Sequence, residues 1–278
     1  MQIHPFETPP VEGCRAASVT GVRARLAFDR SDWVAEEVPV ALEYNGVSHA
    51  VMLTSPSDLE DFAFGFSVTE GIVDDCSQIH DIEMSSSSQG QTLHMRIASS
   101  CFARLKDRRR SMAGRTGCGL CGTDSLAHAV RLPPRLHSGA QFDAGAITRA
   151  LISLRDKQLL LSATGATHAA AWCNADGDIV ILREDVGRHN ALDKLIGTLQ
   201  RGRVSASAGF IVVTSRASYE MVHKTAVAGV VLLAAVSGVT GLAIDVAQGT
   251  GVALLGFVRG EDISVYSHKE RVNLDCTV

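Results

Sequence analysis

The chain has 278 residues, of which 46% are hydrophobic, and its formal net charge at pH 7 is −4. This length and apolar content predict a folded chain with a sizeable core and argue against disorder. The slightly negative charge, with a pI near 6.2, argues against a protein that binds nucleic acid through its overall charge.

The first part of the chain is predicted to hold short strands and one well-marked helix. The strand-like pieces are Val22–Phe28, Val38–Tyr44 and Val47–Thr54. The last two flank Asn45 and Gly46, a dipeptide typical of tight hairpin turns. A helix is expected next, because Ser57 and Glu60 have the spacing of a capping box and Gly71 follows the expected last turn.

The rest of this first part completes a mixed α+β pattern. The expected helix would bury one face, made of Leu59, Phe62, Ala63, Phe66 and Val68. Residues 79–85 and 91–98 are predicted to form a hairpin around the polar tip SSSSQG. Residues 101–112 are predicted to form a short basic helix.

From about Asp143 the pattern changes to strands that alternate with helices. The expected strands are His168–Cys173, Ile179–Glu184, Phe210–Thr214, Val230–Val236 and Val252–Val258. The expected helices are residues 143 to about 161, Ala191–Leu199, Tyr219–Ala228 and Thr240–Ala247. Repeated βα units predict a sheet with parallel neighbours and helices on its faces, so the fold class is α/β, and α+β over the whole chain.

Residues 226–244 form an uncharged stretch that is long enough for a membrane span. Glycines and hydroxyl residues divide it into a short β-branched run and the start of a helix. We therefore expect a buried strand–helix unit and no membrane insertion.

Two cysteines, Cys118 and Cys121, lie in the glycine-rich stretch GRTGCGLCGTDSL. Seven cysteines, an odd number on a long chain, fit a reducing compartment, where such a pair is usually chemical rather than structural. Three chemistries remain open, namely a metal site, a redox disulfide and sulfur carriage. The pair supplies only two of the ligands that zinc needs, and glycines follow both cysteines, unlike in thioredoxin-like motifs.

Basic residues crowd the approach to the cysteine pair. They are Arg104, Lys106, Arg108, Arg109, Arg110 and Arg115. Cations favour a thiolate over a thiol, and four glycines make the loop flexible, as a sulfur carrier would need. A solvated helix face is the simpler interpretation of this basic run, but its place beside the thiols favours an anionic ligand or partner.

Three strand-to-helix corners carry side chains that suit a phosphate. The corner residues are Ser215, Arg216 and Ser218, then Ser237 and Thr240, then Phe257, Arg259 and Gly260. Free N–H groups and the helix dipole favour an anion at such corners, and ligands of open α/β sheets gather beyond the carboxyl ends of the strands. The three together predict a nucleotide or phosphate crevice.

A fourth polar cluster lies in REDVGRHNALDKL. Glu184, Asp185, Arg188 and His189 surround an expected turn into a helix. The cluster is either part of a site or an ion-pair network that holds the corner together. His168, which enters an apolar strand, is expected to be a satisfied core histidine.

Several motifs in this order resemble the formate dehydrogenase accessory sulfurtransferases, the FdhD family. The motifs are RTGCGLCG, TGATHAAAW, EDVGRHNALDKLIG, TSRASYEMVHK, LAAVS and GFVRG. The resemblance begins at the SPSDLEDFAFGF helix and continues to near the C-terminus. It implies a cytoplasmic sulfur carrier, a sulfurtransferase that takes sulfur from a cysteine desulfurase.

The resemblance also implies a recipient and site residues. The recipient is the molybdenum (or tungsten) bis-pyranopterin guanine dinucleotide cofactor of formate dehydrogenase, with guanosine diphosphate as a mimic of its nucleotide end. Cys118 would carry the persulfide, with Cys121 as its partner. The cofactor-binding stretch would be Phe257, Val258, Arg259, Gly260, Glu261 and Asp262. No structural metal is expected.

The fold that the resemblance implies is a cytidine deaminase-like α/β/α sandwich, usually dimeric, with a smaller β-rich N-terminal part. The expected division is residues 1–112, a loop and linker over 113–142, and a cofactor-binding domain over 143–278. Val231 and Val239 stand where the family pattern has proline, which loosens a corner without removing a ligand group.

Two alternatives to a sulfurtransferase remain. One is a cofactor chaperone without catalysis, and the other is a zinc hydrolase of the deaminase type. The zinc hydrolase is disfavoured, because no H-x-E motif precedes CGLCG and Gly117 stands where the deaminase motif has proline.

Overall fold

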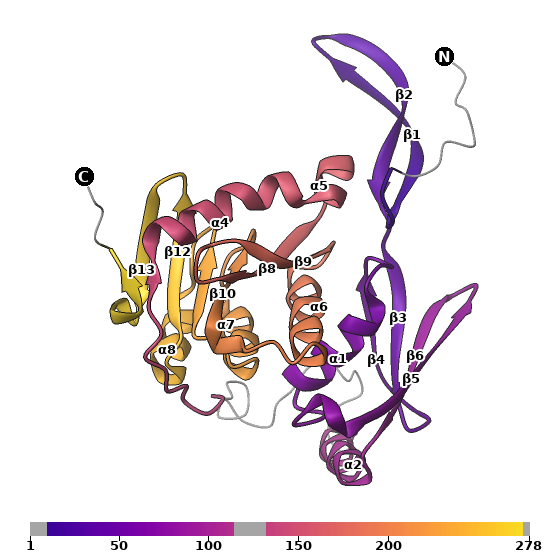
Figure 1. Ribbon diagram of the computed structural model, residues 1–278. Coiled ribbons are helices and arrows are strands. Elements are labelled where there is room, and N and C mark those ends of the chain that lie inside the picture. The colour runs from indigo at the N-terminus through magenta and orange to yellow at the C-terminus, as the bar shows by residue number, and fades with distance from the viewer. Residues whose placement is uncertain (1–9, 114–131, 275–278) are drawn as a thin grey trace.

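The structure, a computed structural model, describes residues 10–113 and 132–274 (Figure 1). Within these residues, strands β1 (Cys14–Arg23) and β2 (Leu26–Ala35) pair only with each other, as an antiparallel ribbon that projects from the body. The predicted strand Val22–Phe28 is therefore wrong, because the turn at Ala24 and Arg25 divides it between two strands. Its apolar residues gave no sign of a turn.

A four-stranded sheet with the order β4-β3-β6-β5 follows. Its strands are β3 (Val38–Tyr44), β4 (Val47–Thr54), β5 (Ile79–Ser87) and β6 (Gly90–Ile97). Helices α1 (Leu59–Thr69) and α2 (Ser99–Ala113) pack on one face, and the predicted buried face of α1 is confirmed. The hairpin around SSSSQG and the basic helix are also confirmed.

The predicted capping box at Ser57 and Glu60 is wrong. The residue before α1 is Asp58, which has a left-handed φ of 54° and makes no side-chain cap. The side chain of Glu60 instead lies 2.9 Å from Arg201, and that of Asp58 lies 3.5 Å from Arg183. The side chains of Asp58 and Glu60 are thus engaged in ion pairs with distant parts of the chain and do not cap the helix.

The second part is a six-stranded sheet with the order β13-β12-β11-β10-β8-β9. Its strands are β8 (His168–Asn174), β9 (Ile179–Asp185), β10 (Gly209–Val213), β11 (Leu232–Ala235), β12 (Ala253–Arg259) and β13 (Asp262–Ser267). Strands β10, β11 and β12 are parallel, and the other three run antiparallel to their neighbours. Short strands β7 (Phe142–Asp143) and β14 (Val272–Asn273) pair beside this sheet.

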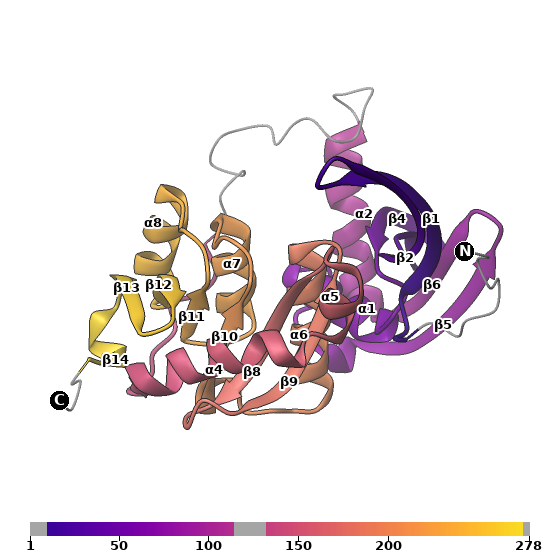
Figure 2. The same cartoon turned by 90° about the horizontal axis from the view of Figure 1, so that it is seen from above.

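Helices cover both faces of the large sheet (Figures 1 and 2). One apolar core joins the sheet to α6 (Arg188–Arg201), α7 (Tyr219–Val227) and α8 (Gly241–Thr250). Another joins it to α4 (Ala144–Lys157), which a break at Gln158 separates from α5 (Leu159–Thr164). The predicted three-layer α/β/α sandwich is confirmed, and the specific likeness to cytidine deaminases stays a prediction.

The uncharged stretch 226–244 becomes the end of α7, the buried strand β11 and the start of α8, as predicted. Within residues 10–113 and 132–274, no helix has the length and apolar character to cross a membrane.

Helices α1 and α6 join the two parts of the molecule by an unusually close crossing. A Cβ added to Gly65 would lie 1.8 Å from the backbone oxygen of Asp193, and one added to Gly197 would lie 1.9 Å from that of Asp61. The two helix backbones therefore touch through glycine, and no other residue fits at either position.

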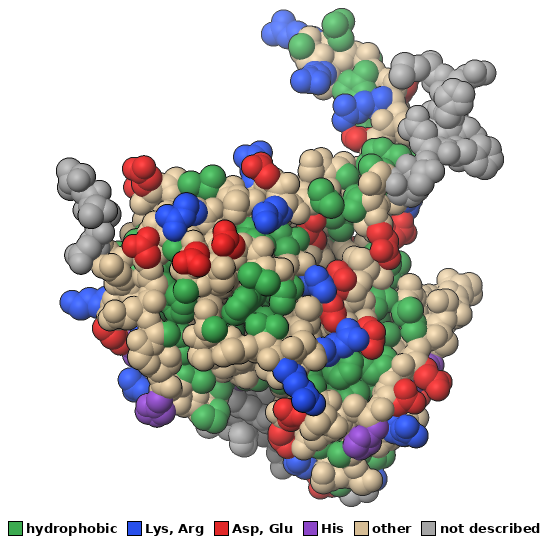
Figure 3. Space-filling model, in the orientation of Figure 1, with side chains coloured by type: hydrophobic (Ala, Val, Ile, Leu, Met, Phe, Trp, Pro, Cys, Tyr) green, Lys and Arg blue, Asp and Glu red, His purple; other side chains and the backbone are tan. Residues whose placement is uncertain are grey.

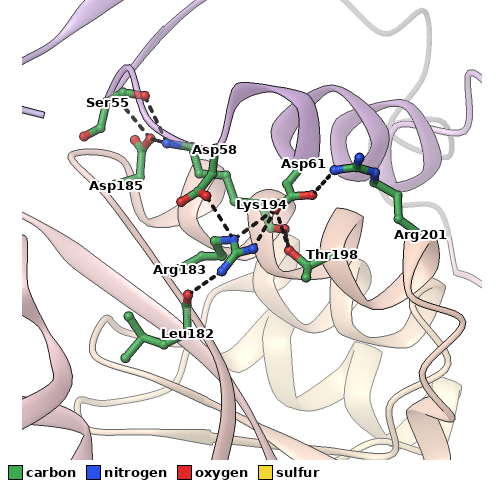
Figure 4. Close-up of polar contacts among 9 residues, drawn as sticks. All are labelled: Ser55, Asp58, Asp61, Leu182, Arg183, Asp185, Lys194, Thr198 and Arg201. Atoms are coloured by element: carbon green, nitrogen blue, oxygen red, sulfur yellow. Dashed lines mark hydrogen bonds and ion pairs between the residues drawn. The ribbon is translucent and has the colours of Figure 1, made fainter. Parts of the chain in front are cut away.

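Buried charges surround this crossing (Figure 4). The carboxylate of Asp61 accepts hydrogen bonds from Arg183 (2.7 Å), Arg201 (2.6 Å) and Thr198 (2.9 Å). Burial alone would raise the pKa of Asp61, but these hydrogen bonds outweigh burial and hold that pKa below its usual value. Because α1 carries the acid and β9 and α6 carry the cations, the interaction fixes the two parts together.

Two buried lysines add to the junction. Lys194 and Asp185 form an ion pair of 2.6 Å with both side chains fully buried, and Lys194 also donates to the backbone oxygen of Ser55. Lys224 lies within 3.0 Å of Asp193 and Glu70. Burial opposes the charge of Lys224, but these two carboxylates raise its pKa above the usual value.

The glycine crossing predicts that Gly65→Ala destabilises the protein by about 3 kcal/mol or more, because two rigid backbones must separate. The control is Gly241→Ala, at a helical glycine with no neighbouring atom within 4 Å, which should change stability by no more than about 1 kcal/mol. Urea unfolding measures both. Equal stability of the two variants would contradict the close crossing.

The ion pairs of Asp61 predict that Asp61→Asn costs about 2 kcal/mol at pH 7, because the buried Asp61 side chain loses its charge-assisted hydrogen bonds to the partly exposed Arg183 and Arg201. Glu60→Gln, at the adjacent exposed acid, should cost less than about 1 kcal/mol. Since the folded-state pKa of Asp61 is lowered, its contribution is present at neutral pH and is lost as pH falls through that pKa. The gap between wild type and Asp61→Asn should therefore shrink in acid, and a gap that does not depend on pH would contradict this account.

Candidate functional site

The carboxyl ends of β10, β11 and β12 lie next to one another, because these strands are parallel neighbours. The same edge holds the start of β8 and the end of β9, since Ala170 pairs with Val213 and His168 pairs with Asp185. All the strand-end residues that the sequence singled out from His168 to Arg259 therefore meet at one edge of the sheet.

Backbone hydrogen bonds tie the three predicted corners together. Ala217 N–H donates to the oxygen of Gly238 (3.1 Å), and Thr240 N–H donates to the oxygen of Ala217 (3.2 Å). Phe257 N–H in turn donates to the oxygen of Ser237 (3.1 Å). The corners thus form one connected surface.

The hydroxyl groups at these corners differ in what they contact. The Thr240 side chain caps α8 by accepting from the N–H of Ala243, and the Ser215 hydroxyl donates to the oxygen of Arg216. Ser218 precedes α7, but its side chain makes no cap, and its buried hydroxyl has no partner among the described residues. Among the described residues no side chain caps the N-terminus of α7, and its first N–H groups suit an anionic ligand.

A cleft of about 840 Å³ opens between these strand ends and the helices α4 and α5. Its lining includes Thr214, Val236, Val258, Arg259 and Gly260 from the strand ends, and Arg155 from α4. The predicted corner residues Ser215, Arg216, Ser218, Ser237, Thr240 and Phe257 do not line it but belong to the same edge. The charged lining is two arginines and the carboxylate of Asp156, so the cleft carries net positive charge and suits an anionic ligand with a ring system.

The end of β12 has a strained backbone. Phe257 has a left-handed φ of 51° although it is not glycine, and its ring is 46% exposed. One side of the ring contacts Gly238, and the guanidinium of Arg259 lies 6.0 Å from the ring centre. Glu261 and Asp262 are exposed at the following turn. Strain of this kind often accompanies a ligand site.

Sequence patterns did not point to Gln158, which also lines the cleft. Its side chain is 2% exposed, and its amide nitrogen has no hydrogen-bond partner among the described residues. A buried amide donor without a partner is costly unless a ligand or water accepts from it. Gln158 belongs to no sequence motif. Only its position in the folded chain, at the break between α4 and α5, identifies it as a candidate site residue.

The cluster Glu184, Asp185, Arg188 and His189 divides into two roles. Glu184 accepts hydrogen bonds from the N–H groups of Leu160 and Leu161 and so holds the start of α5. Asp185 belongs to the buried pair with Lys194. For Asp185 the ion-pair interpretation is correct, whereas Glu184 holds its corner through hydrogen bonds from backbone N–H groups.

His189 Nε2 lies 2.8 Å from a carboxylate oxygen of Glu220 of α7, and this close contact lowers the pKa of that carboxyl. His168 is only half buried, so the expected core position is wrong, because β8 begins at the sheet edge. Burial and the nearby charge of Arg188 lower the pKa of His168 below its usual value. At neutral pH His168 is therefore uncharged beside a charged arginine.

The predicted persulfide carrier Cys118 and its partner Cys121 lie outside the described residues. Two cysteines that the structure does describe are poor candidates for thiol chemistry. Burial raises the pKa of Cys173 to about 12 and that of Cys76 to about 11. Both remain protonated at neutral pH, and a protonated thiol is a weak nucleophile.

Comparison with known proteins identifies the family. The sequence model of the FdhD/NarQ family matches residues 35–273. This chain belongs to that family. It is 57% identical over 255 residues to a protein of Variovorax paradoxus strain S110 named sulfur carrier protein FdhD, an alignment that covers 92% of each chain. A Bordetella petrii protein of the same name is 52% identical over 98% of each chain.

The fold also has a solved counterpart. A crystal structure from Desulfotalea psychrophila, of a protein proposed to be a formate dehydrogenase accessory protein, matches with a TM-score of 0.73. The match covers 94% of this chain and 99% of that one, at 23% sequence identity. The architecture of this FdhD/NarQ family member is thus shared across distant sequences.

Proposed function

We propose that this FdhD/NarQ family protein is a sulfur carrier that serves formate dehydrogenase. It would accept sulfur from a cysteine desulfurase and deliver it to the molybdenum or tungsten bis-pyranopterin guanine dinucleotide cofactor. We further propose that it acts in the cytoplasm and as a homodimer. The observation that carries the proposal is the cleft at the sheet edge, in a chain whose relatives are named sulfur carriers.

The cleft has the chemistry that a guanine dinucleotide cargo needs. Its volume of about 840 Å³ lies within the range usual for small-molecule sites. Arg155 and Arg259 would attract diphosphate groups, and the N–H groups at the start of α7, which lies at the same sheet edge but does not line the cleft, would bind a phosphate that extends beyond it. The buried amide of Gln158 would donate to a carbonyl or phosphate oxygen.

The transfer step we propose belongs to Cys118. Its thiolate would attack the outer sulfur of a persulfide on the cysteine desulfurase. The new S–S bond forms on Cys118, the donor's S–S bond breaks, and the donor cysteine leaves as a thiolate, so no net oxidation occurs. Basic residues near the pair in the sequence favour the thiolate that this step requires.

A second candidate is a cofactor chaperone that binds the cofactor without carrying sulfur. The cleft favours it as much as it favours the carrier, because the cleft alone would suffice for binding. The two proposals differ in whether a thiol is needed.

The carrier proposal predicts a gain of one sulfur atom on Cys118 after incubation with a cysteine desulfurase and free cysteine. Intact-mass spectrometry should detect this gain in the wild type and in the control variant Cys173→Ala, and a thiol reductant should reverse it. Cys118→Ala should show none. An unmodified wild type, or equal modification of Cys118→Ala, would exclude the carrier role.

The chaperone is tested with the same protein. If the protein carries sulfur, cells that contain only the Cys118→Ala variant should fail to activate formate dehydrogenase. If it is only a chaperone, the same variant should still activate the enzyme. Activation that survives the loss of both Cys118 and Cys121 would therefore favour the second candidate.

The cleft predicts that Gln158→Leu weakens the binding of guanosine diphosphate roughly five- to tenfold, the loss expected for one hydrogen bond. Gln141→Leu is the control, because the Gln141 amide is exposed and donates to the oxygen of Glu270. Calorimetric titration measures both. Unchanged affinity in Gln158→Leu, with the fold intact, would remove Gln158 from the site.

A further inference from the structure

The starts of helices α6 and α7 form a polar cluster at the sheet edge, on the face of the sheet opposite the cleft. Both helices share the apolar core on one face of the large sheet, whereas α4, which lines the cleft, covers the other face (Figure 2). His189 of α6 and Glu220 of α7 lie 2.8 Å apart, so the two helix starts are in contact. None of the described residues at these helix starts lines the cleft.

Arg188, the first residue of α6, forms no ion pair within the described residues. The acids around it are engaged elsewhere, because Asp185 pairs with the buried Lys194. Glu184 accepts from backbone N–H groups of α5, and Glu220 contacts the histidine that follows Arg188. The Nε atom of Arg188 is buried and has no hydrogen-bond partner among the described residues. A buried donor without a partner is costly, so the arrangement points to a ligand that accepts from it.

Other arginines of the same elements are paired. Arg183 of β9 and Arg201 of α6 each lie within 3.0 Å of a carboxylate oxygen. Over the body of the molecule in Figure 3, acidic and basic side chains likewise lie close together. Arg188 instead lies near His168, and burial and the Arg188 charge lower the pKa of that histidine below its usual value. At neutral pH this imidazole is uncharged and does not balance the charge of Arg188.

Ser218 adds a second unpartnered donor to the cluster. It precedes α7 and lies two residues before Glu220, so the contact of Glu220 with α6 brings Ser218 to the same helix starts as Arg188. The Ser218 hydroxyl is buried and has no partner among the described residues, and no described side chain caps the first N–H groups of α7. As whole residues Arg188 and Ser218 are only half-buried, so solvent and small ligands reach the cluster.

A ligand for this cluster must accept hydrogen bonds and carry negative charge. No group of three or more metal-binding side chains exists within the described residues, so the cluster does not suit a metal cation. An oxyanion accepts from a guanidinium, a hydroxyl and helix N–H groups at the same time. Glu220, the acid of this cluster, is engaged by His189 and therefore repels an anion less than a free carboxylate would.

We propose that Arg188, Ser218 and the first N–H groups of α7 bind a phosphoryl group, in a subsite separate from the cleft. The subsite rests on the proposed function only for the source of that group, which would be the nucleotide end of the cargo. Thr214 lines the cleft and lies four residues before Ser218, a span of at most about 14 Å. One extended cargo molecule can therefore reach from the cleft over the sheet edge to the subsite.

The test uses inorganic phosphate as the probe, with binding followed by amide chemical shifts in two-dimensional NMR. Arg188→Gln keeps a polar side chain but removes its charge, and Ser218→Ala removes only the hydroxyl. Arg203→Gln is the matched control, because Arg203 is an exposed arginine just beyond the opposite end of α6. Circular dichroism confirms that each variant is folded.

Wild type and Arg203→Gln should bind phosphate equally, with the largest shifts at the amides of residues 217–221. Arg188→Gln should bind at least roughly tenfold more weakly and Ser218→Ala roughly threefold more weakly, because a hydrogen bond from a charged group is worth more than one from a neutral group. A wild type that does not bind phosphate, equal affinity in folded Arg188→Gln, or shifts confined to residues of the cleft would each overturn the subsite.

Competition with guanosine diphosphate identifies the source of the phosphoryl group. If the subsite holds the nucleotide end of the cargo, guanosine diphosphate should displace inorganic phosphate, and Arg188→Gln should weaken both ligands. If it takes a separate phosphate, both ligands should bind at once, and Gln158→Leu should weaken only the nucleotide. Either result supports the subsite and assigns its ligand.

Failure of the subsite is distinguishable from failure of the sulfur carrier. A protein without the subsite would still gain sulfur on Cys118, and a protein that gains no sulfur would still bind phosphate at Arg188.

Discussion

The contact of α1 with α6 is the constraint on which the rest of the molecule depends. Gly65 and Gly197 let the two helix backbones touch, and this closeness brings Asp61 to Arg183 and Arg201. The same junction buries the pair of Asp185 and Lys194 at the corner between β9 and α6. The adjacent Glu184 then holds the start of α5, which forms one wall of the cleft. The end of β9 therefore carries both Asp185, which stabilises the junction of the two parts, and Glu184, which positions the α5 wall of the cleft.

The sequence predicted those parts of the site whose signals are local. The corners after β10 and β11 each combine an apolar strand with a serine or threonine before a helix, and parallel order brings them together. The corner after β12 was also expected to lead into a helix, but it is a tight turn into the antiparallel strand β13. The break at Gln158, its unpartnered amide and the cleft beside it had no local signal, because they arise from the packing of α4 and α5 on the sheet. For the same reason Ser57 and Glu60 suggested a capping box, while the folded chain uses Glu60 in a contact with Arg201.

The distribution of charge explains how an acidic chain can attract anions. Arg155, Arg188 and Arg259 lie on elements that meet at the sheet edge, and the β1–β2 ribbon has its own group of arginines. Recognition of the anionic nucleotide that we propose would thus depend on local concentrations of charge rather than on the net value of −4. The β1–β2 ribbon and the cleft also share a structural element, because α5 contacts the base of the ribbon and lines the cleft.

A crystal structure with bound guanosine diphosphate tests the central claim most directly, namely that the sheet edge holds an anionic nucleotide. We predict density between α5 and the ends of β10 and β12, with phosphate oxygens within hydrogen-bonding distance of Arg259 or of the corner N–H groups. A nucleotide bound to another surface, with the cleft occupied only by solvent, would contradict the account.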